Sequence, residues 1–457
     1  MTSKSERKEF WQLLLKLALP IALQHLLINS LTFIDTFFMS QLGDIELAAS
    51  GMATQWNWLL SMATFGLCSG TALFVAQYWG ARKISGIHTT YSIASVTSLS
   101  VSMLFFVLAI LIPEKIISVF NKDPEIIKCG AAYLSIVCFS YPATVLNSVL
   151  STVLRSTERV RLPMLAAIVS TSLNAVLDYA LMFGAFGLPA MGGRGAALAT
   201  AISAWVGLAV VIVISVCQKN ILCIAPRKFF SFGKLDFINF MKKASPVIFN
   251  ELLWGLGTVT NNAIYSNTGY ENYAACTILR TIESLGLILF IGLNDGGAVI
   301  IGKTVGEGKY AKAYTNARRL VITVPLISLV IGMAVIALRT SIIHVFNMSG
   351  NISDVTLGIA SVLVIIYALE LCIRNIPYTL VCAVFRSGGD SLTGAKFDII
   401  CLWALAIPTT FVCAYWLDIP FWTVFLIGYL VEDIPKAVMC LKHFFSRKWI
   451  KPVVNKQ

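Results

Sequence analysis

The chain has 457 residues, of which 57% are hydrophobic and 13% are charged. A soluble globular domain carries roughly 25% charged residues, so this composition excludes a protein whose whole surface faces water. The formal net charge of +12 would suit a nucleic-acid partner, but the distribution of the basic residues argues against one.

Long apolar stretches recur along the whole chain. Each approaches or exceeds the about 20 residues that a helix needs to cross a bilayer, and none has the period-two alternation of a membrane β-barrel strand. Because a spanning segment must satisfy its own backbone hydrogen bonds, these stretches predict helices. The predicted fold class is an all-α membrane protein with twelve transmembrane helices, near residues 13–39, 47–79, 89–112, 126–152, 162–186, 195–217, 244–268, 272–302, 320–338, 356–384, 397–416 and 419–441.

The basic residues sort by side of the membrane. Most of the 35 Lys and Arg residues precede the first segment, follow the last one or lie in connections on that same side. The opposite connections hold Lys115, Lys122, Lys128, Arg194 and Arg339. An excess of Lys and Arg marks the cytoplasmic side. Both chain ends are therefore predicted to be cytoplasmic, and the positive charge reflects topology rather than nucleic-acid binding.

The first apolar segment follows Lys4, Arg7 and Lys8, as the core of a secretory signal peptide would. It runs to Met39, which is too long for such a core, and no small-residue cleavage pattern ends it. We expect it to remain as the first span. The 11 cysteines are scattered without a CxxC pair, which favours reduced, buried thiols over a disulfide framework or a zinc site.

An internal repeat divides the chain. Four residue pairs coincide at one constant offset: Pro20 with Pro246, Gly66 with Gly292, Gly70 with Gly296 and Gly80 with Gly306. The repeat predicts two pseudo-symmetric six-helix bundles: an N-lobe over 1–217, a cytoplasmic linker over 218–243 and a C-lobe over 244–457. Because each half has an even number of spans, we expect both to have the same orientation, with a cleft between them.

Several segments resemble the multidrug and toxic compound extrusion (MATE) family, bacterial type, over nearly the whole chain. They include ALPIALQHLLINSLTFIDTFFMSQLGDIELAA (Ala18–Ala49), AQYWGA (Ala76–Ala81), LNAVLDYALMFG (Leu173–Gly184), FNELLWGLG (Phe249–Gly257) and SRKWIKP (Ser446–Pro452). The resemblance implies an inner-membrane antiporter, not an enzyme, that exchanges H⁺ or Na⁺ for amphipathic, often cationic, organic compounds. It implies an organic substrate and the lipid bilayer as partners, and no cofactor besides the coupling ion. We expect a monomer.

Acidic side chains inside apolar segments are candidates for function, because an Asp at the centre of a spanning helix costs ~2.5–3.5 kcal/mol. Asp35 and Asp178 lie at similar depth, each about 22 Å of helix rise beyond a proline near the cytoplasmic end of its segment. Asn174 shares a helix face with Asp178, and Thr200 reaches the same level. Such oxygen groups can bind Na⁺ or hold a proton, and the resemblance implies the same four residues as a cation site. The alternative is a polar cluster that only holds the helices together.

The second half places its acid at another depth. Asn261 occupies the repeat position of Asp35, whereas Glu251 lies about 15 Å closer to the cytoplasm by helix rise. Trp254, at i+3, offers an aromatic face to an organic cation, and Asn375 is expected at similar depth. The resemblance supports Glu251 as a coupling or substrate carboxylate, and both roles stay open.

Other charged residues have a simpler interpretation. Three pairs have i+3 or i+4 spacing and can neutralise themselves along one helix: Arg280 with Glu283, Glu370 with Arg374, and Glu432 with Lys436. Glu283 is kept as a substrate or coupling candidate because it lies near mid-membrane. Pro20 is the conformational candidate, because a proline in a spanning helix frees a backbone carbonyl and permits a kink.

Competing functions fit the sequence less well. A lipid-linked saccharide flippase of the same broader superfamily would need a basic cleft, but the basic residues well inside predicted spans, Arg280, Arg374 and Lys436, each lie near an acid. An intramembrane enzyme would show HExxH or GxSxG in a span, and an ATP-driven pump would show GxxxxGK[ST]; neither pattern is present. A passive channel is disfavoured by the unequal acids of the two repeats. The choice between H⁺ and Na⁺ stays open, because the same carboxylates serve both.

Overall fold

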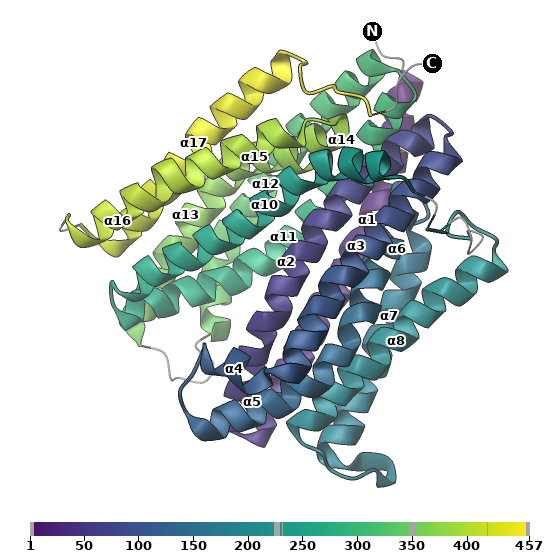
Figure 1. Cartoon of the computed structure of the whole chain (residues 1–457). Helices are drawn as coiled ribbons and strands as arrows, with labels where there is room; N and C mark the ends of the chain where they lie inside the picture. Colours follow the sequence, from purple (N-terminus) through teal and green to yellow (C-terminus); the bar gives the residue numbers. More distant parts are fainter. Residues whose placement is uncertain (1–3, 224–228, 231, 347–352, 418, 454–457) are drawn as a thin grey trace. The chain divides into compact units, whose positions relative to one another are not determined.

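The structure is a computed structural model that describes residues 4–223, 229–230, 232–346, 353–417 and 419–453. Helices make up most of these ranges, which contain no β-strand. Figure 1 shows the helices in chain order. The elements of the first half are α1 Lys4–Leu42, α2 Asp44–Gly80, α3 Ile84–Leu111, α4 Pro113–Ser118, α5 Pro124–Val137, η1 Cys138–Ser140, α6 Tyr141–Ser156, α7 Arg161–Phe183, η2 Ala185–Gly187 and α8 Gly193–Cys217.

The second half also consists of long helices, and it contains two π-helical segments. Its elements are α10 Lys234–Ser266, α11 Tyr270–Gly306, α12 Tyr310–Phe346, α13 Asp354–Tyr378, η3 Thr379–Phe385, α14 Arg386–Gly388, α15 Ser391–Ile399, η4 Ile400–Ala406, α16 Ile407–Tyr415 and α17 Phe421–Phe445. The segments η3 and η4 are π-helical. Such insertions into α-helices are rare and often occur at functional sites, and η3 directly follows α13, which contains Pro377.

Most of the helices are long and apolar enough to cross a membrane. Among the residues that the structure describes, ten helical segments meet both conditions. Helices α10 and α17, which coincide with the seventh and twelfth predicted spans, have 33 and 25 residues but are not among those ten. Helix α17 contains three charged residues, Glu432, Asp433 and Lys436, whereas the apolar part of α10 is made more polar by Glu251 and by Asn250, Asn261 and Asn262. The protein is therefore a multi-pass membrane protein.

Two compact units share the chain. Unit 2 spans Leu19–Ile248, and unit 1 combines Met1–Ala18 with Phe249–Gln457. The division thus falls inside α1 and α10 rather than between helices, and both helices continue through a proline, Pro20 and Pro246. The lobe boundaries inferred from the repeat remain a prediction.

Two glycines at matching repeat positions allow close packing of a helix: Gly70 against the N-terminal part of α10, and Gly296 against the N-terminal part of α1. In unit 2, a Cβ added at Gly70 would lie 2.6 Å from the Ala244 Cβ atom at the start of α10. In unit 1, a Cβ at Gly296 would lie 3.3 Å from the backbone nitrogen of Ala18 on α1. These two contacts join equivalent residues, because Gly70 matches Gly296 and Ala18 matches Ala244. Each unit therefore includes the start of a helix whose remainder belongs to the other unit.

The segment after α17 packs against the loop between α14 and α15. Trp449 is fully buried, and its indole nitrogen donates to the Phe444 carbonyl at 3.2 Å. The backbone nitrogen of Lys451 donates to the Gly388 carbonyl at 2.8 Å. Gly389 has φ +98°, and a Cβ there would collide with the Lys451 carbonyl. Only glycine suits both the backbone conformation and the close approach.

Asp390 anchors the same contact. Its carboxylate lies 2.8 Å from Lys451 Nζ and 2.9 Å from His443 Nε2, and it accepts a hydrogen bond from the Thr393 hydroxyl at 2.9 Å. Burial alone would raise the pKa of Asp390, but these hydrogen bonds outweigh it, and the pKa lies below its ordinary value.

Candidate cation and substrate sites

Small residues bring α7 and α8 close together in unit 2. These helices pack side by side along their length (Figure 1). A Cβ added at Gly195 would lie 2.6 Å from the Leu181 carbonyl group, and one at Gly207 would lie 3.0 Å from the Ser170 Cβ atom. The Ser170 hydroxyl also donates to the Ser203 carbonyl at 2.8 Å. This packing holds the polar face of α7 against the start of α8.

The four residues predicted in the N-lobe lie together. Asn174 and Asp178 of α7 are fully buried, and Asp35 of α1 is half-buried. The amide orientation that satisfies hydrogen bonding lets the Asn174 side-chain nitrogen donate to Asp178 Oδ2 at 3.0 Å and to Asp35 Oδ1 at 3.3 Å. The Asn174 oxygen then accepts from the backbone N–H of Thr200 at 3.2 Å. Thr200 therefore joins the cluster through its backbone, where the sequence predicted its hydroxyl.

The two carboxyl groups lie close together, with no basic partner among the residues that the structure describes. They lie within hydrogen-bonding reach of each other, and Asp178 Oδ1 is buried with no hydrogen-bond partner. Within the described part of the chain, no Lys, Arg or His side chain forms a salt bridge with either acid. Tyr133 of α5 is close enough to interact electrostatically with both. Nothing in the sequence pointed to Tyr133, since a tyrosine in an apolar segment usually contributes only to packing.

This arrangement requires a positive charge. Two ionised carboxylates this close, one of them fully buried, would repel each other, and no basic side chain of the described residues pairs with either to offset its desolvation. A proton shared between them, or a Na⁺ ion held by their oxygens, would remove the excess charge. The geometry therefore makes the cluster chemically able to take up a cation.

Glu251 of α10 has a basic partner that sequence reasoning missed. Its Oε1 lies 2.6 Å from Arg386 Nη2, and the two side chains are 12% and 7% exposed. Arg386 was assigned to a cytoplasmic connection, but it begins the short helix α14 and is buried. A positive charge in a predicted loop gives no hint that the side chain turns inward. Glu251 is thus a paired carboxylate rather than a free one.

Glu283 of α11 also pairs with another helix. Its Oε1 lies 2.9 Å from Arg374 Nη1 of α13 and accepts a hydrogen bond from the Tyr429 hydroxyl of α17 at 2.8 Å. Two of the three predicted pairs within one helix, Arg280 with Glu283 and Glu370 with Arg374, are therefore wrong. The i+3 and i+4 spacings permit such pairs, but a partner on a neighbouring helix takes Arg374. The third is confirmed: Lys436 Nζ lies 3.0 Å from Glu432 Oε1.

The remaining C-lobe candidates have separate surroundings. Trp254 is 41% exposed, and Asn375 is buried with its amide donating to the Leu371 carbonyl of its own helix at 2.9 Å. Glu251, Glu283 and Asn375 thus have different partners, and no contact among them gathers these candidates into one site.

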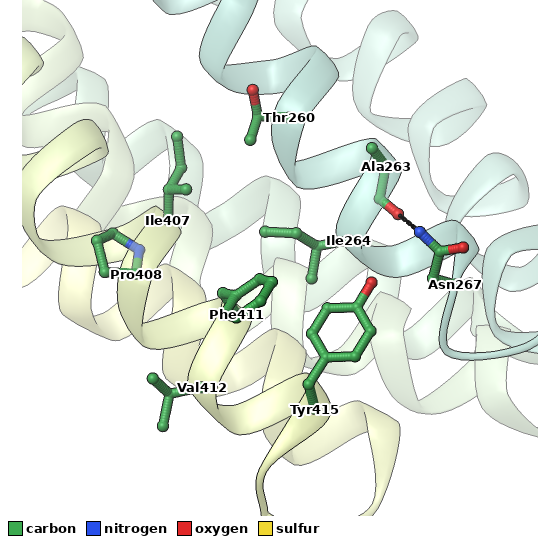
Figure 2. A pocket seen from close by; sticks show the side chains of 9 residues that line it. All are labelled: Thr260, Ala263, Ile264, Asn267, Ile407, Pro408, Phe411, Val412 and Tyr415. Carbon is green, nitrogen blue, oxygen red and sulfur yellow. Dashed lines mark hydrogen bonds between the residues drawn. The ribbon is translucent and has the colours of Figure 1, made fainter.

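An apolar pocket of about 460 Å³ lies between α10 and α16 in unit 1. Figure 2 shows Ile264 of α10 facing Phe411 and Tyr415 of α16 across it. Its polar side chains include Asn267, whose amide donates to the Ala263 carbonyl at 2.9 Å. No acidic residue lines this pocket, so it provides apolar surface but no charge for a cation.

Comparison with known proteins assigns the family. The MatE family profile matches residues 20–180 and 246–412, one match in each repeat. The chain belongs to the MATE family. Among relatives of this MATE transporter, a probable multidrug resistance protein NorM of Thermotoga maritima is 25% identical over 460 residues, covering 99% of the chain and 96% of the relative. An uncharacterized transporter, YisQ of Bacillus subtilis, is 21% identical over 96% of the chain and 95% of its own length.

Solved structures share the fold. A MATE crystal structure in the bent conformation matches with a TM-score of 0.87 at 18% identity, covering 98% of this chain and 99% of that one. A MOP superfamily transporter from Pyrococcus furiosus, for which reverse polarity of the binding pocket suggests a different function, matches with a TM-score of 0.85 at 18% identity over 95% and 96%. At these identities the likeness establishes the MATE architecture and leaves the substrate to other arguments.

Proposed function

We propose that this MATE transporter expels amphipathic or cationic organic compounds in exchange for H⁺ or Na⁺. The observation that carries the proposal is the pair formed by half-buried Asp35 and buried Asp178, two carboxyl groups within hydrogen-bonding reach of each other that form no salt bridge with a basic side chain among the described residues. Several relatives are named as probable multidrug resistance proteins, which supports an organic substrate. The coupling cation binds at Asp35, Asn174, Asp178 and Thr200.

The cation site acts on α1 in this mechanism. Asp35 lies on α1 and Asp178 on α7, so loading the site joins two helices that an unloaded, doubly charged site would push apart. Pro20, inside α1, removes one backbone hydrogen bond and lets the helix bend at that point. Loading therefore favours one shape of α1 and emptying favours another, and the substrate leaves when the shape changes.

We also propose the number of helices, their orientation in the membrane and the residues of the second repeat that take part. Twelve helices form two six-helix repeats of like orientation in the inner membrane, with both chain ends cytoplasmic. Glu251, Trp254, Glu283 and Asn375 are assigned to substrate or coupling in the second repeat. The protein works as a monomer with no cofactor besides the coupling ion.

Efflux from proteoliposomes tests the proposal. A fluorescent organic cation is loaded, and ΔpH and ΔNa⁺ are imposed separately on the wild type, on Asp35→Asn and on Glu114→Gln, which removes an exposed acid of α4. We expect one gradient to drive efflux in the wild type and in Glu114→Gln, and neither to drive it in Asp35→Asn. Undiminished coupled efflux in Asp35→Asn would overturn the assignment.

A lipid-linked saccharide flippase is the second candidate, and the same vesicles test it. Its polyanionic headgroup needs unpaired basic groups, whereas Arg374 and Arg386 are each paired with a glutamate. Gradient-independent movement of such a lipid, with no efflux of the organic cation, would favour the flippase.

A further inference from the structure

A second pair of buried acids lies in unit 1, away from Glu251 and Glu283. Glu370 of α13 and Asp433 of α17 are each 3% exposed, on two helices that pack together. Their carboxyl groups lie within hydrogen-bonding reach of each other. Both oxygens of Glu370 are buried, and no hydrogen-bond donor bonds either of them. A buried carboxylate in that position would be strongly destabilising.

The nearby cations form salt bridges with acids other than Glu370. Arg374, one turn along α13 from Glu370, is 2.9 Å from Glu283. Lys436 of α17 lies 3.4 Å from Asp433, 3.0 Å from Glu432 and 3.4 Å from Asp398. The groups that face Glu370 are therefore Asp433 and Glu432 from α17 and Arg374 from its own helix. Tyr367 and Tyr429 are close enough to interact electrostatically with Glu370. Glu283 of α11 interacts in the same way with Arg374.

The position of Arg374 indicates the charge on Glu370. An ionised Glu370 at i−4 would attract Arg374 along the helix, yet the guanidinium bonds Glu283 of another helix instead. Asp433 differs, because Lys436 is near enough to balance its charge. The pair thus offers one neutral carboxyl as hydrogen-bond donor and one carboxylate as acceptor.

We propose that Glu370 holds a buried proton and donates it in a hydrogen bond to the Asp433 carboxylate, a proton-binding site in unit 1 separate from Asp35 and Asp178. A metal ion fits less well. No group of three or more His, Cys, Asp or Glu side chains suited to a metal occurs among the residues described, and Asp433 is already paired with Lys436 at 3.4 Å. The proposal concerns binding, so it stands or falls independently of coupled efflux.

Infrared spectroscopy of the full-length protein in lipid detects the proton directly. A protonated carboxyl has a C=O stretch apart from that of a carboxylate. At neutral pH we expect Glu370→Gln to lose one such band, Asp433→Asn to shift it, and Asp354→Asn, which removes an exposed acid at the start of α13, to leave it unchanged. Because glutamine resembles a protonated glutamate in shape, the thermal unfolding midpoint of Glu370→Gln should match that of the wild type at neutral pH.

Several results would overturn the site. One is a spectrum of Glu370→Gln that keeps every protonated-carboxyl band of the wild type. Another is loss of the band when Na⁺ is added at constant pH, which would mean that a metal cation occupies the position. A large fall in the unfolding midpoint of Glu370→Gln would also count against it, because it would mean that a charge was lost. Asp35→Asn serves as a separate arm: if it abolishes efflux but keeps the Glu370 band, the two sites are distinct.

Discussion

Breaking the Glu251–Arg386 pair should destabilise unit 1 far more than removing it altogether. The two charged atoms are 2.6 Å apart, and the side chains are 12% and 7% exposed. Removal of one partner from a buried pair costs about 3–5 kcal/mol, because the other charge stays buried without compensation. Replacing both by uncharged groups of similar volume is often neutral. We therefore expect large losses of stability in Arg386→Met and in Glu251→Gln.

A double-mutant cycle isolates the interaction. Arg386 has contacts besides Glu251, so Arg386→Met should lose more stability than Glu251→Gln. The double variant should be more stable than either single variant, so the sum of the two single losses should exceed the double loss by about 3 kcal/mol or more, the upper end of the range for residues in direct contact. The assay is denaturant-induced unfolding in detergent micelles. The control is Lys309→Met, which removes a pair 2.8 Å long whose lysine is 61% exposed; exposed pairs contribute about 0–1 kcal/mol. Additive losses in the double variant would refute the reasoning.

Three further predictions concern packing and pH. Trp449→Ala should cost about 3–5 kcal/mol, because a fully buried Trp is removed, whereas Trp416→Ala, at a side chain 74% exposed, should change the unfolding midpoint little; equal midpoints in both variants would contradict the buried contact. Gly70→Ala should cost about 1–3 kcal/mol through overpacking against α10, while Gly51→Ala, on the same helix with nothing within 4 Å of the added Cβ, should not; the comparison uses thermal unfolding. The contribution of Asp390 to stability should be complete at neutral pH and fall as the pH drops below the ordinary carboxyl value of about 3.9, because its pKa is lowered in the fold; Asp390→Asn should flatten that acid limb, and an unchanged limb would contradict the assignment.

The helices and the N-lobe cluster could be predicted because each depends on local information. Apolar length predicts a spanning helix, and helix rise converts residue spacing into depth, which was enough to bring Asp35 level with Asp178. Each of the twelve predicted segments falls on one helix or on consecutive helical elements of the structure. The hydrogen bonds within the cluster could not be predicted, because the sequence does not show that Thr200 donates its backbone N–H rather than using its hydroxyl.

Partners between helices could not be predicted. Spacing along one helix lists the pairs that are possible, and Arg374 had Glu370 within reach, yet it bonds Glu283. That choice depends on how α11, α13 and α17 pack, which no local pattern encodes. Arg386 was missed for the same reason, since the short α14 between η3 and a glycine turn buries a charge that a hydropathy profile assigns to a loop.

The reciprocal contacts of Gly70 with Ala244 and Gly296 with Ala18 have a consequence for synthesis. As the chain emerges from the ribosome, unit 2 lacks its last element until residue 248 has been made, although most of its helices are complete by residue 217. The first residues, in turn, wait for α11 before they have a partner in unit 1. Neither half can finish folding before the other has begun, which makes the two repeats a single cooperative product of translation.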